Sequence, residues 1–114
     1  MAEYVIDYFE LPVASAPVSS DFFARAFGWG AQSYGETYVE VREAGVLGGL
    51  NSDPSDMTQA PVIGIRTDDI VAAEKAVLAA GGTITRKTYD FPGGKRFVFR
   101  EPGGAELLVY QPTD

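Results

Sequence analysis

The sequence contains neither cysteine nor histidine among its 114 residues. Without cysteine, disulfides, thiolate nucleophiles and cysteine-ligated zinc sites are excluded. Without histidine, the chain lacks the commonest general base, the commonest transition-metal ligand and the usual serine or cysteine triad. These two absences remove most of the familiar nucleophilic and metal-dependent active sites.

Basic residues are also few, since nine lysines and arginines stand against sixteen acidic residues, for a formal net charge of −7. A negatively charged chain repels phosphate backbones, so we do not expect a nucleic-acid partner. No apolar run approaches the roughly 18 residues that a membrane span needs. Residues 1–10 lack the basic-then-apolar layout of a signal peptide. We therefore expect a cytoplasmic protein that does not enter a membrane.

The composition is otherwise ordinary for a globular protein, with 46% hydrophobic and 22% charged residues. Alternating apolar and polar residues over positions 4–13 predict a strand. A helix should follow, capped by Ser19 or Ser20 and ended by Gly28. Aromatic side chains on this helix and just after it are expected in the core: Phe22, Phe23, Phe27 and Trp29. Three strands should come next, over about residues 31–34, 37–42 and 46–51.

The same pattern begins again after a polar stretch at about residues 52–60, which is typical of a linker. Alternation over residues 62–67 predicts a strand. The helix after it should be capped by Asp68 or Asp69 and stopped by the glycine pair at 81–82. Its apolar stripe is expected to be Ile70, Ala73, Val77 and Ala80. Three further strands should cover about residues 83–87, 95–100 and 105–111.

The two halves keep a constant offset, because Gly28 and Gly82, which follow the two predicted helices, are 54 positions apart. This spacing predicts two β-α-β-β-β modules, about residues 1–51 and 61–114, within one domain of residues 1–114. A single module cannot cover both faces of its sheet. We therefore expect an α+β fold in which the modules form a curved mixed sheet with the helices on its convex face. Alternate strand residues would then line the concave face.

Several short motifs carry a resemblance to a known family. They are Phe9-Glu10-Leu11-Pro12-Val13, Phe27-Gly28-Trp29, Gly48-Gly49-Leu50, Thr67-Asp68-Asp69-Ile70, Gly81-Gly82, Pro92-Gly93-Gly94 and Glu101-Pro102-Gly103-Gly104. In this order and spacing, the chain resembles the vicinal oxygen chelate superfamily of glyoxalases, bleomycin-resistance proteins and extradiol dioxygenases. The resemblance covers nearly the whole chain. It implies paired β-α-β-β-β modules with a small-molecule site in the concave face.

Catalytic members of this superfamily usually hold one divalent metal in the concave face. The resemblance places the ligand positions at Tyr8, at Gly48 or Gly49, at Val62 and at Leu108. These residues do not offer the imidazole or carboxylate groups that iron, nickel or zinc require. We therefore expect neither a metal site nor a cofactor.

Candidate ligand-binding residues follow mainly from strand parity with those positions. A carboxylate can orient a cation, an arginine an anion, and a tyrosine can stack or donate a hydrogen bond. The expected set also includes one residue that follows the predicted 92–94 turn, and it comprises Tyr8, Glu10, Tyr38, Arg66, Arg96, Glu106, Leu108 and Tyr110. The alternative interpretation is that these strand residues are solvated or paired with one another and have no ligand.

Two functions from different classes fit this pattern. The first is a metal-independent protein that sequesters a small molecule, as the resemblance to bleomycin-resistance proteins implies. The acidic balance favours a cationic or neutral ligand with aromatic surface. The second is a metal-free enzyme of the same superfamily, an isomerase, epimerase or lyase with Glu10 or Glu106 as its base. An α+β dimer with no ligand is a third interpretation, and the residues name neither a ligand nor a pathway.

Assembly can also be predicted from size and strand edges. A small chain with unpaired strand edges gains apolar burial by association, so we expect a homodimer with residues 4–9 at the meeting edge. In relatives, the concave cup is often completed across two chains. The residues leave open whether the modules pair within one chain or between two.

Overall fold

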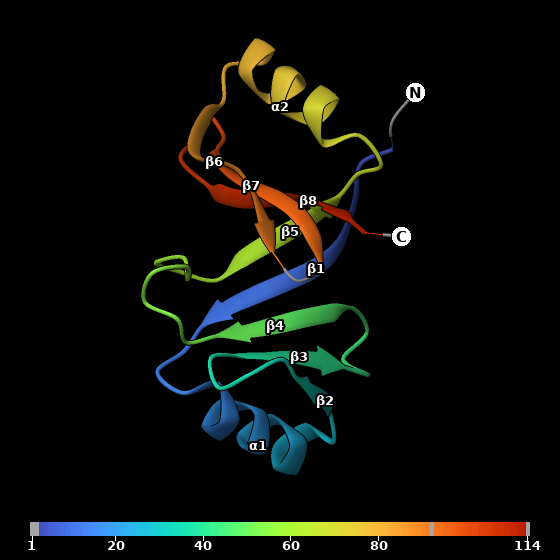
Figure 1. Ribbon diagram of the computed structural model, residues 1–114, viewed down its shortest axis with the longest axis vertical. Coiled ribbons are helices and arrows are strands. Elements are labelled where there is room, and N and C mark those ends of the chain that lie inside the picture. The colour runs from blue at the N-terminus through green and yellow to red at the C-terminus, as the bar shows by residue number, and fades with distance from the viewer. Residues whose placement is uncertain (1–2, 92, 114) are drawn as a thin grey trace. The chain divides into compact units, whose positions relative to one another are not determined.

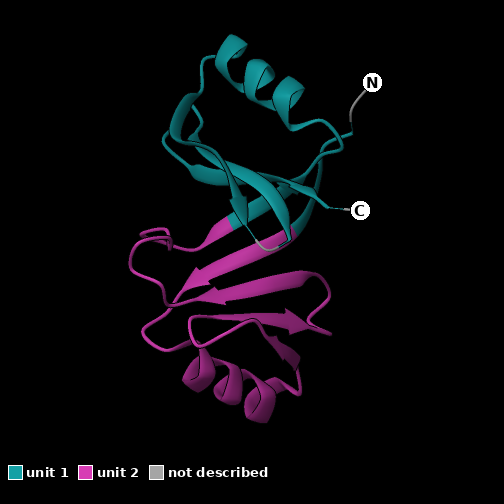
Figure 2. Cartoon of the chain, viewed as in Figure 1, with its two compact units in different colours: residues 1–7, 63–114 teal, residues 8–62 magenta. Residues whose placement is uncertain are grey.

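The computed structural model describes residues 3–91 and 93–113 (Figure 1). Pro92, which begins the turn predicted at 92–94, lies outside the described residues. The chain forms two compact units (Figure 2). Unit 2 comprises residues 8–62, and unit 1 comprises residues 1–7 and 63–114.

Unit 2 contains four strands in the order β2-β3-β4-β1. They are β1 (Val5–Pro12), which enters this unit at residue 8, β2 (Gly30–Ser33), β3 (Tyr38–Arg42) and β4 (Leu47–Asn51). β1 and β4 run parallel, whereas β2, β3 and β4 are antiparallel neighbours. A parallel pair needs a long connection. Here that connection contains α1 (Ala16–Phe27), β2 and β3.

One face of this sheet packs against α1. Buried or half-buried apolar side chains occur at alternate strand positions, as a period-two pattern predicts. From β1, β3 and β4 they are Phe9, Leu11, Val39, Val41 and Leu50. The other strand residues therefore belong to the face that α1 does not cover.

The start of α1 differs from the prediction. Its N-cap is Ser15, whose hydroxyl accepts a hydrogen bond from the backbone N–H of Val18 at 3.3 Å. The helix thus begins about one turn before Ser19 and Ser20. Pro17 permits the early start, because the first turn leaves its N–H groups without helical partners and proline has none to lose. Gly28 ends the helix in the left-handed conformation, with φ of 75°, as expected.

Two of the aromatic residues predicted in the core are instead exposed. Phe22 and Phe27 are 54% and 62% exposed, whereas Phe23 and Trp29 pack on the core of unit 2. A helix on the surface of a sheet buries only one stripe of its circumference. Phe23 lies in that stripe, and Phe22 is turned about 100° away from it. The exposed rings contact the half-buried rings of Phe23 and Trp29. The centroid of the Phe22 ring, for example, lies 5.3 Å from that of Phe23.

Unit 1 contains four strands in the order β5-β8-β7-β6. They are β5 (Val62–Arg66), which enters this unit at residue 63, β6 (Thr83–Phe91), β7 (Gly94–Arg100) and β8 (Glu106–Pro112). β5 and β8 are parallel, and β6, β7 and β8 are antiparallel neighbours. β6 extends four residues beyond its predicted end at Lys87. It also contains two register shifts against β7, between Ile84 and Tyr89.

The helix of this unit, α2 (Ile70–Ala79), is capped by Asp69, one of the two predicted residues. The Asp69 carboxylate accepts a hydrogen bond from the backbone N–H of Ala72 at 3.0 Å. Ile70 and Ala73 from α2 are buried, as predicted, and Val77 packs beside them, whereas Ala80 is exposed. On the strand side the core is built by Phe97, Phe99 and Val109, with Ile65, Ile84 and Leu107 packed against it.

The predicted α+β fold with two β-α-β-β-β modules is confirmed. The 54-residue offset also holds for features that alternation alone does not define. The helix caps Ser15 and Asp69 keep it, and so do the buried first helical residues, Ala16 and Ile70. Neither helix, over the described residues, is long and apolar enough to cross a membrane.

Candidate functional site

The helix-free face of the unit 2 sheet carries a cluster of polar side chains. Strand pairing sets Glu10 of β1 beside Gly49 of β4, and Gly49 beside Glu40 of β3. Tyr8 and Tyr38 lie two residues from these positions on their own strands, and therefore on the same face. Three of the predicted ligand-binding residues, Tyr8, Glu10 and Tyr38, are thus brought together.

The three side chains form one hydrogen-bonded chain. The Tyr38 hydroxyl donates to Oε1 of Glu10 at 2.9 Å, and a short hydrogen bond joins the hydroxyls of Tyr8 and Tyr38. Glu10 has no exposed surface, although it is a carboxylic acid. A buried carboxylate requires hydrogen-bond donors to offset its lost hydration. The structure therefore places Glu10 in a specific polar setting, which we call the Glu10 cluster (Tyr8, Glu10 and Tyr38).

Gly49 makes room for the Glu10 cluster. A Cβ atom at this position would overlap the Tyr38 hydroxyl and lie 2.7 Å from the Tyr8 hydroxyl. Any larger residue would displace the tyrosine that donates to Glu10. Sequence analysis identified Gly49 as part of a family motif and as a position without a metal-binding side chain. Its role beside Tyr8 and Tyr38 depends on β4 lying between β1 and β3.

A second polar pair lies farther along β3. Arg42 donates from Nε to Oε1 of Glu40 at 2.7 Å. This hydrogen bond raises the pKa of the Arg42 guanidinium above its usual value. Because the Arg42 side chain is about half exposed, the pair contributes little to stability. Glu40 is therefore engaged by a neighbour on its own strand.

In unit 1, Arg66 and Tyr110 meet at Asp7. The Tyr110 hydroxyl donates to Oδ1 of Asp7 at 2.5 Å, and Arg66 Nη1 lies 3.9 Å from Asp7 Oδ2. β5 and β8 set Arg66 directly beside Tyr110. Two predicted residues are therefore neighbours, joined by a carboxylate that sequence reasoning missed. No local signal identified Asp7, because it is 103 residues from Tyr110 and its strand parity is opposite to that of Tyr8.

Arg96 belongs to a cation–aromatic cluster in unit 1. It is only 3% exposed, and its Nε donates to the Tyr89 hydroxyl at 2.5 Å. The guanidinium of Arg86 lies 3.7 Å from the centroid of the Tyr89 ring, and that of Arg96 lies 5.4 Å from the Phe91 ring. Such contacts are favourable because a ring face is electron-rich. Sequence reasoning missed Tyr89 because it ended this strand at residue 87, and it assigned no role to Arg86, which lies within the predicted strand.

The two remaining candidates, Glu106 and Leu108, precede Tyr110 in β8. Glu106 accepts a hydrogen bond from Thr85 at 3.3 Å, and its carboxylate lies 3.5 Å from Arg100 Nη2. Leu108 is buried, with 1% of its surface exposed. Glu106 begins the strand, four residues before Tyr110, and is therefore at the opposite end of β8 from the Arg66–Asp7–Tyr110 group.

The metal-ligand positions that the resemblance implies do not fit a metal ion. The Tyr8 hydroxyl is hydrogen-bonded to Tyr38, Gly49 has no side chain, and Val62 and Leu108 are buried apolar residues. Over residues 3–91 and 93–113, no group of three or more Asp, Glu, His or Cys side chains is placed to hold a metal. The helix-free faces can instead bind polar groups through carboxylate, phenol and guanidinium.

Comparisons with known proteins agree with this fold. The model of the Glyoxalase/Bleomycin resistance protein/Dioxygenase superfamily matches residues 5–109. No protein with a curated description matches the chain.

Solved structures with the same fold include three that cover most of the chain. A hypothetical protein from Bacillus halodurans C-125 has a TM-score of 0.80 and 10% identity, covering 98% of this chain and 96% of that one. Methylmalonyl-CoA epimerase from Mycobacterium tuberculosis has a TM-score of 0.74 and 12% identity, covering 96% and 88%. A member of the same superfamily from Vibrio splendidus 12B01 has a TM-score of 0.64 and 16% identity, covering 99% and 100%. At these identities the likeness concerns the fold alone.

Proposed function

Because this chain belongs to the Glyoxalase/Bleomycin resistance protein/Dioxygenase superfamily, we propose that it binds and sequesters a small organic molecule without a metal ion. In the Glu10 cluster, the half-buried Tyr8 and Tyr38 would contact the ligand, and the charge of the buried Glu10, which is hydrogen-bonded to Tyr38, would favour a cationic ligand. The observation that carries this proposal is a buried carboxylate on the sheet face opposite α1, hydrogen-bonded to the first of two linked tyrosines that are only half-buried.

The chemistry of the Glu10 cluster defines the ligand class. A carboxylate in a low-dielectric setting attracts a cation or a strong hydrogen-bond donor more strongly than it does in water. Tyr8 and Tyr38 add ring faces that stack on a flat ligand. Their hydroxyls can also accept hydrogen bonds from donor groups of the ligand. The net charge of −7 favours approach of a cation. We therefore expect an aromatic ligand that carries an amine or another donor group.

A thermal-shift screen against amines, metabolites and antibiotics tests this proposal. A ligand present at about 100 times its Kd should stabilise the native state by about 2.7 kcal/mol. We expect Glu10→Gln to weaken the best ligand about tenfold or more, because the variant keeps the shape but loses the charge. Isothermal titration calorimetry measures this change in affinity.

Glu36→Gln is the matched control, since Glu36 is an exposed glutamate in the loop before β3. It should leave the affinity unchanged. Binding should also survive dialysis against EDTA, because the proposed site uses no metal. A screen with no saturable ligand, or a ligand that binds Glu10→Gln as tightly as the wild type, contradicts the proposal.

A catalytic role for Glu10 is the second candidate. A buried carboxylate beside a phenol is also an arrangement suited to proton abstraction. Glu106 is the other candidate base, and Arg100 and Thr85 contact its carboxylate. Nuclear magnetic resonance spectra of each screening hit after long incubation separate the two functions. A product, or deuterium exchange from D₂O, that disappears in Glu10→Gln supports the enzyme, and an unchanged molecule supports sequestration.

We also propose a homodimer that uses the start of β1. Four apolar residues of unit 1 are between 45% and 61% exposed, and we call them the patch: Tyr4, Val5 and Ile6 near the start of β1, and Ile63 of β5. A second copy of the chain would bury these side chains, and a two-fold dimer is the commonest closed assembly. Light scattering should return about twice the chain mass at micromolar concentration, and Ile6→Glu should shift this toward one chain mass.

Val71→Glu is the control for the dimer, because Val71 is 61% exposed on α2 and lies outside the patch. This variant should keep the wild-type mass. A wild-type protein that remains at one chain mass across a wide dilution series excludes the dimer.

A further inference from the structure

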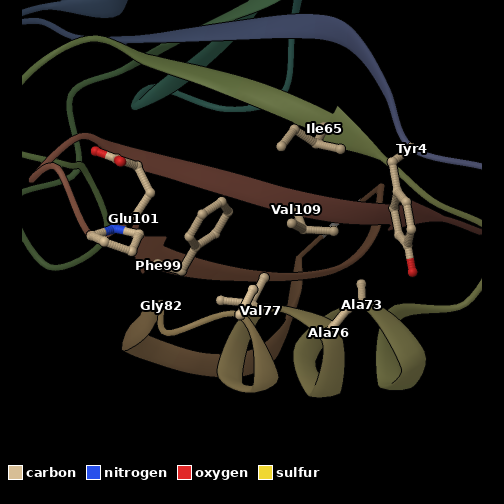
Figure 3. Close-up of a pocket in the computed structure, with 11 residues that line it drawn as sticks. Tyr4, Ile65, Ala73, Ala76, Val77, Gly82, Phe99, Glu101 and Val109 are labelled. Atoms are coloured by element: carbon tan, nitrogen blue, oxygen red, sulfur yellow. The ribbon is translucent and has the colours of Figure 1, made fainter.

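An apolar cavity lies between α2 and its sheet in unit 1, on the face opposite to Arg66, Arg96 and Tyr110 (Figure 3). Its volume is about 250 Å³. The side chains around it are almost entirely hydrocarbon, with α2 on one side, strands on the other and a tyrosine at one end: Tyr4, Ile65, Ala73, Val77, Phe99 and Val109. This face takes no part in the Glu10 cluster.

The other module shows what this space accommodates. In unit 2, the gap between α1 and its sheet holds aromatic rings, since Phe23 and Trp29 stack at 5.1 Å between centroids with an interplanar angle of 22°. At the equivalent positions of the second module, 54 residues later, the chain has Val77 and Thr83. The second module therefore lacks the rings that fill the first.

Larger strand residues replace only part of the missing volume. β7 contributes Phe97 and Phe99 to the core of unit 1, where β3 contributes Val39 and Val41 to that of unit 2. The helix side remains small, with alanine at positions 73, 76 and 80. The space beside α2 therefore stays partly open, with exposed residues such as Tyr4, Ala76 and Ala80 at its border.

Among the described residues that line the cavity, Glu101 is the one carboxylate, and it is already engaged. Glu101 accepts hydrogen bonds from the backbone N–H groups of Ala105 at 2.6 Å and Gly103 at 2.7 Å. These bonds lower the pKa of Glu101 and hold its charge on the turn between β7 and β8. The described lining residues therefore offer no free charge to an ionic ligand, and an apolar lining favours a neutral one.

We propose that this cavity is a second binding site, which accepts a neutral, flat aromatic molecule of one or two rings. The size agrees, because a cavity of about 150 Å³ lined by apolar side chains is large enough for benzene. The ligand would lie between Val77 and Phe99, as the rings of Phe23 and Trp29 lie between α1 and its sheet. This site is independent of the function proposed for Glu10.

Indole and naphthalene are the probes for this site. We expect saturable one-site binding of indole by calorimetry, with chemical-shift changes at the methyl groups of Ile65, Val77 and Val109. Val77→Phe, which restores the ring found in the first module, should weaken indole binding about tenfold or more. Ala76→Leu narrows the cavity from the helix side, and it provides a second test should Val77→Phe fail to fold.

Two controls separate this site from others. Ala79→Leu makes the same change on α2 at a residue that does not line the cavity, and it should bind indole as the wild type does. Glu10→Gln should also leave indole binding intact, so that failure of the Glu10 proposal and failure of this one are distinguishable. The proposal is overturned if the wild type shows no saturable binding of either probe, or if Val77→Phe and Ala76→Leu bind indole unchanged.

Discussion

Phe97→Ala is expected to lower the free energy of unfolding by about 3–5 kcal/mol. Phe97 in β7 has no exposed surface, and its ring lies 6.1 Å from that of Phe99 between centroids. Truncation removes a buried ring and leaves a void that two neighbouring strands cannot close. For a domain whose total stability is roughly 5–15 kcal/mol, the loss is a large fraction of the whole. Urea denaturation followed by circular dichroism measures it.

Phe22→Ala is the matched control, because it deletes the same ring from a residue that is 54% exposed on α1. The loss should be below about 1 kcal/mol, as for most substitutions on the surface. The pair also tests the exposed position of Phe22, which sequence analysis had assigned to the core because it is an aromatic residue on a helix. Equal losses for the two variants would contradict the exposed position.

Arg96→Met is expected to lower the free energy of unfolding by about 3 kcal/mol. Methionine has a similar length and suits a buried position, but it cannot donate to the Tyr89 hydroxyl or present a cation to the Phe91 ring. Arg96→Lys should recover little of this stability, since an ammonium group lacks the planar fork of a guanidinium. Thermal and urea denaturation of the three proteins give the comparison.

Arg100→Met is the control for this prediction. Arg100 lies in the same strand, but its side chain is 49% exposed and its ion pair with Glu106 is long, at 3.5 Å. Its loss should be below about 1 kcal/mol, as is usual for a surface pair. A loss at Arg96 no greater than that at Arg100 would show that the buried guanidinium is not a structural element. Arg96 would then be better regarded as available for a ligand.

The sequence predicts the part of the candidate site that depends only on the alternation of side chains along one strand. Tyr8 and Glu10 share a face because successive side chains on a strand alternate, and this holds whatever the neighbouring strands are. Their connection to Tyr38 follows less directly, since it requires β4 to lie between β1 and β3 with a glycine opposite Glu10. The Tyr89–Arg96 contact was missed because β6 runs past its predicted end with two register shifts, which alternation does not reveal.

The sequence by itself determined the repeat, the order of helices and strands, the Asp69 cap as one of two choices, and the absence of histidine and cysteine. These properties depend on residues that are close along the chain or on composition, so periodicity and turn chemistry are enough to read them. Only the tertiary structure decided that Phe22 and Phe27 are exposed, that Tyr110 meets Asp7, and that a cavity remains beside Val77. Each of these depends on which residues from distant segments come into contact, and on how much volume they fill once packed. Local patterns carry no information about either, because the same apolar residue satisfies the pattern whether its neighbour across the core is large or small.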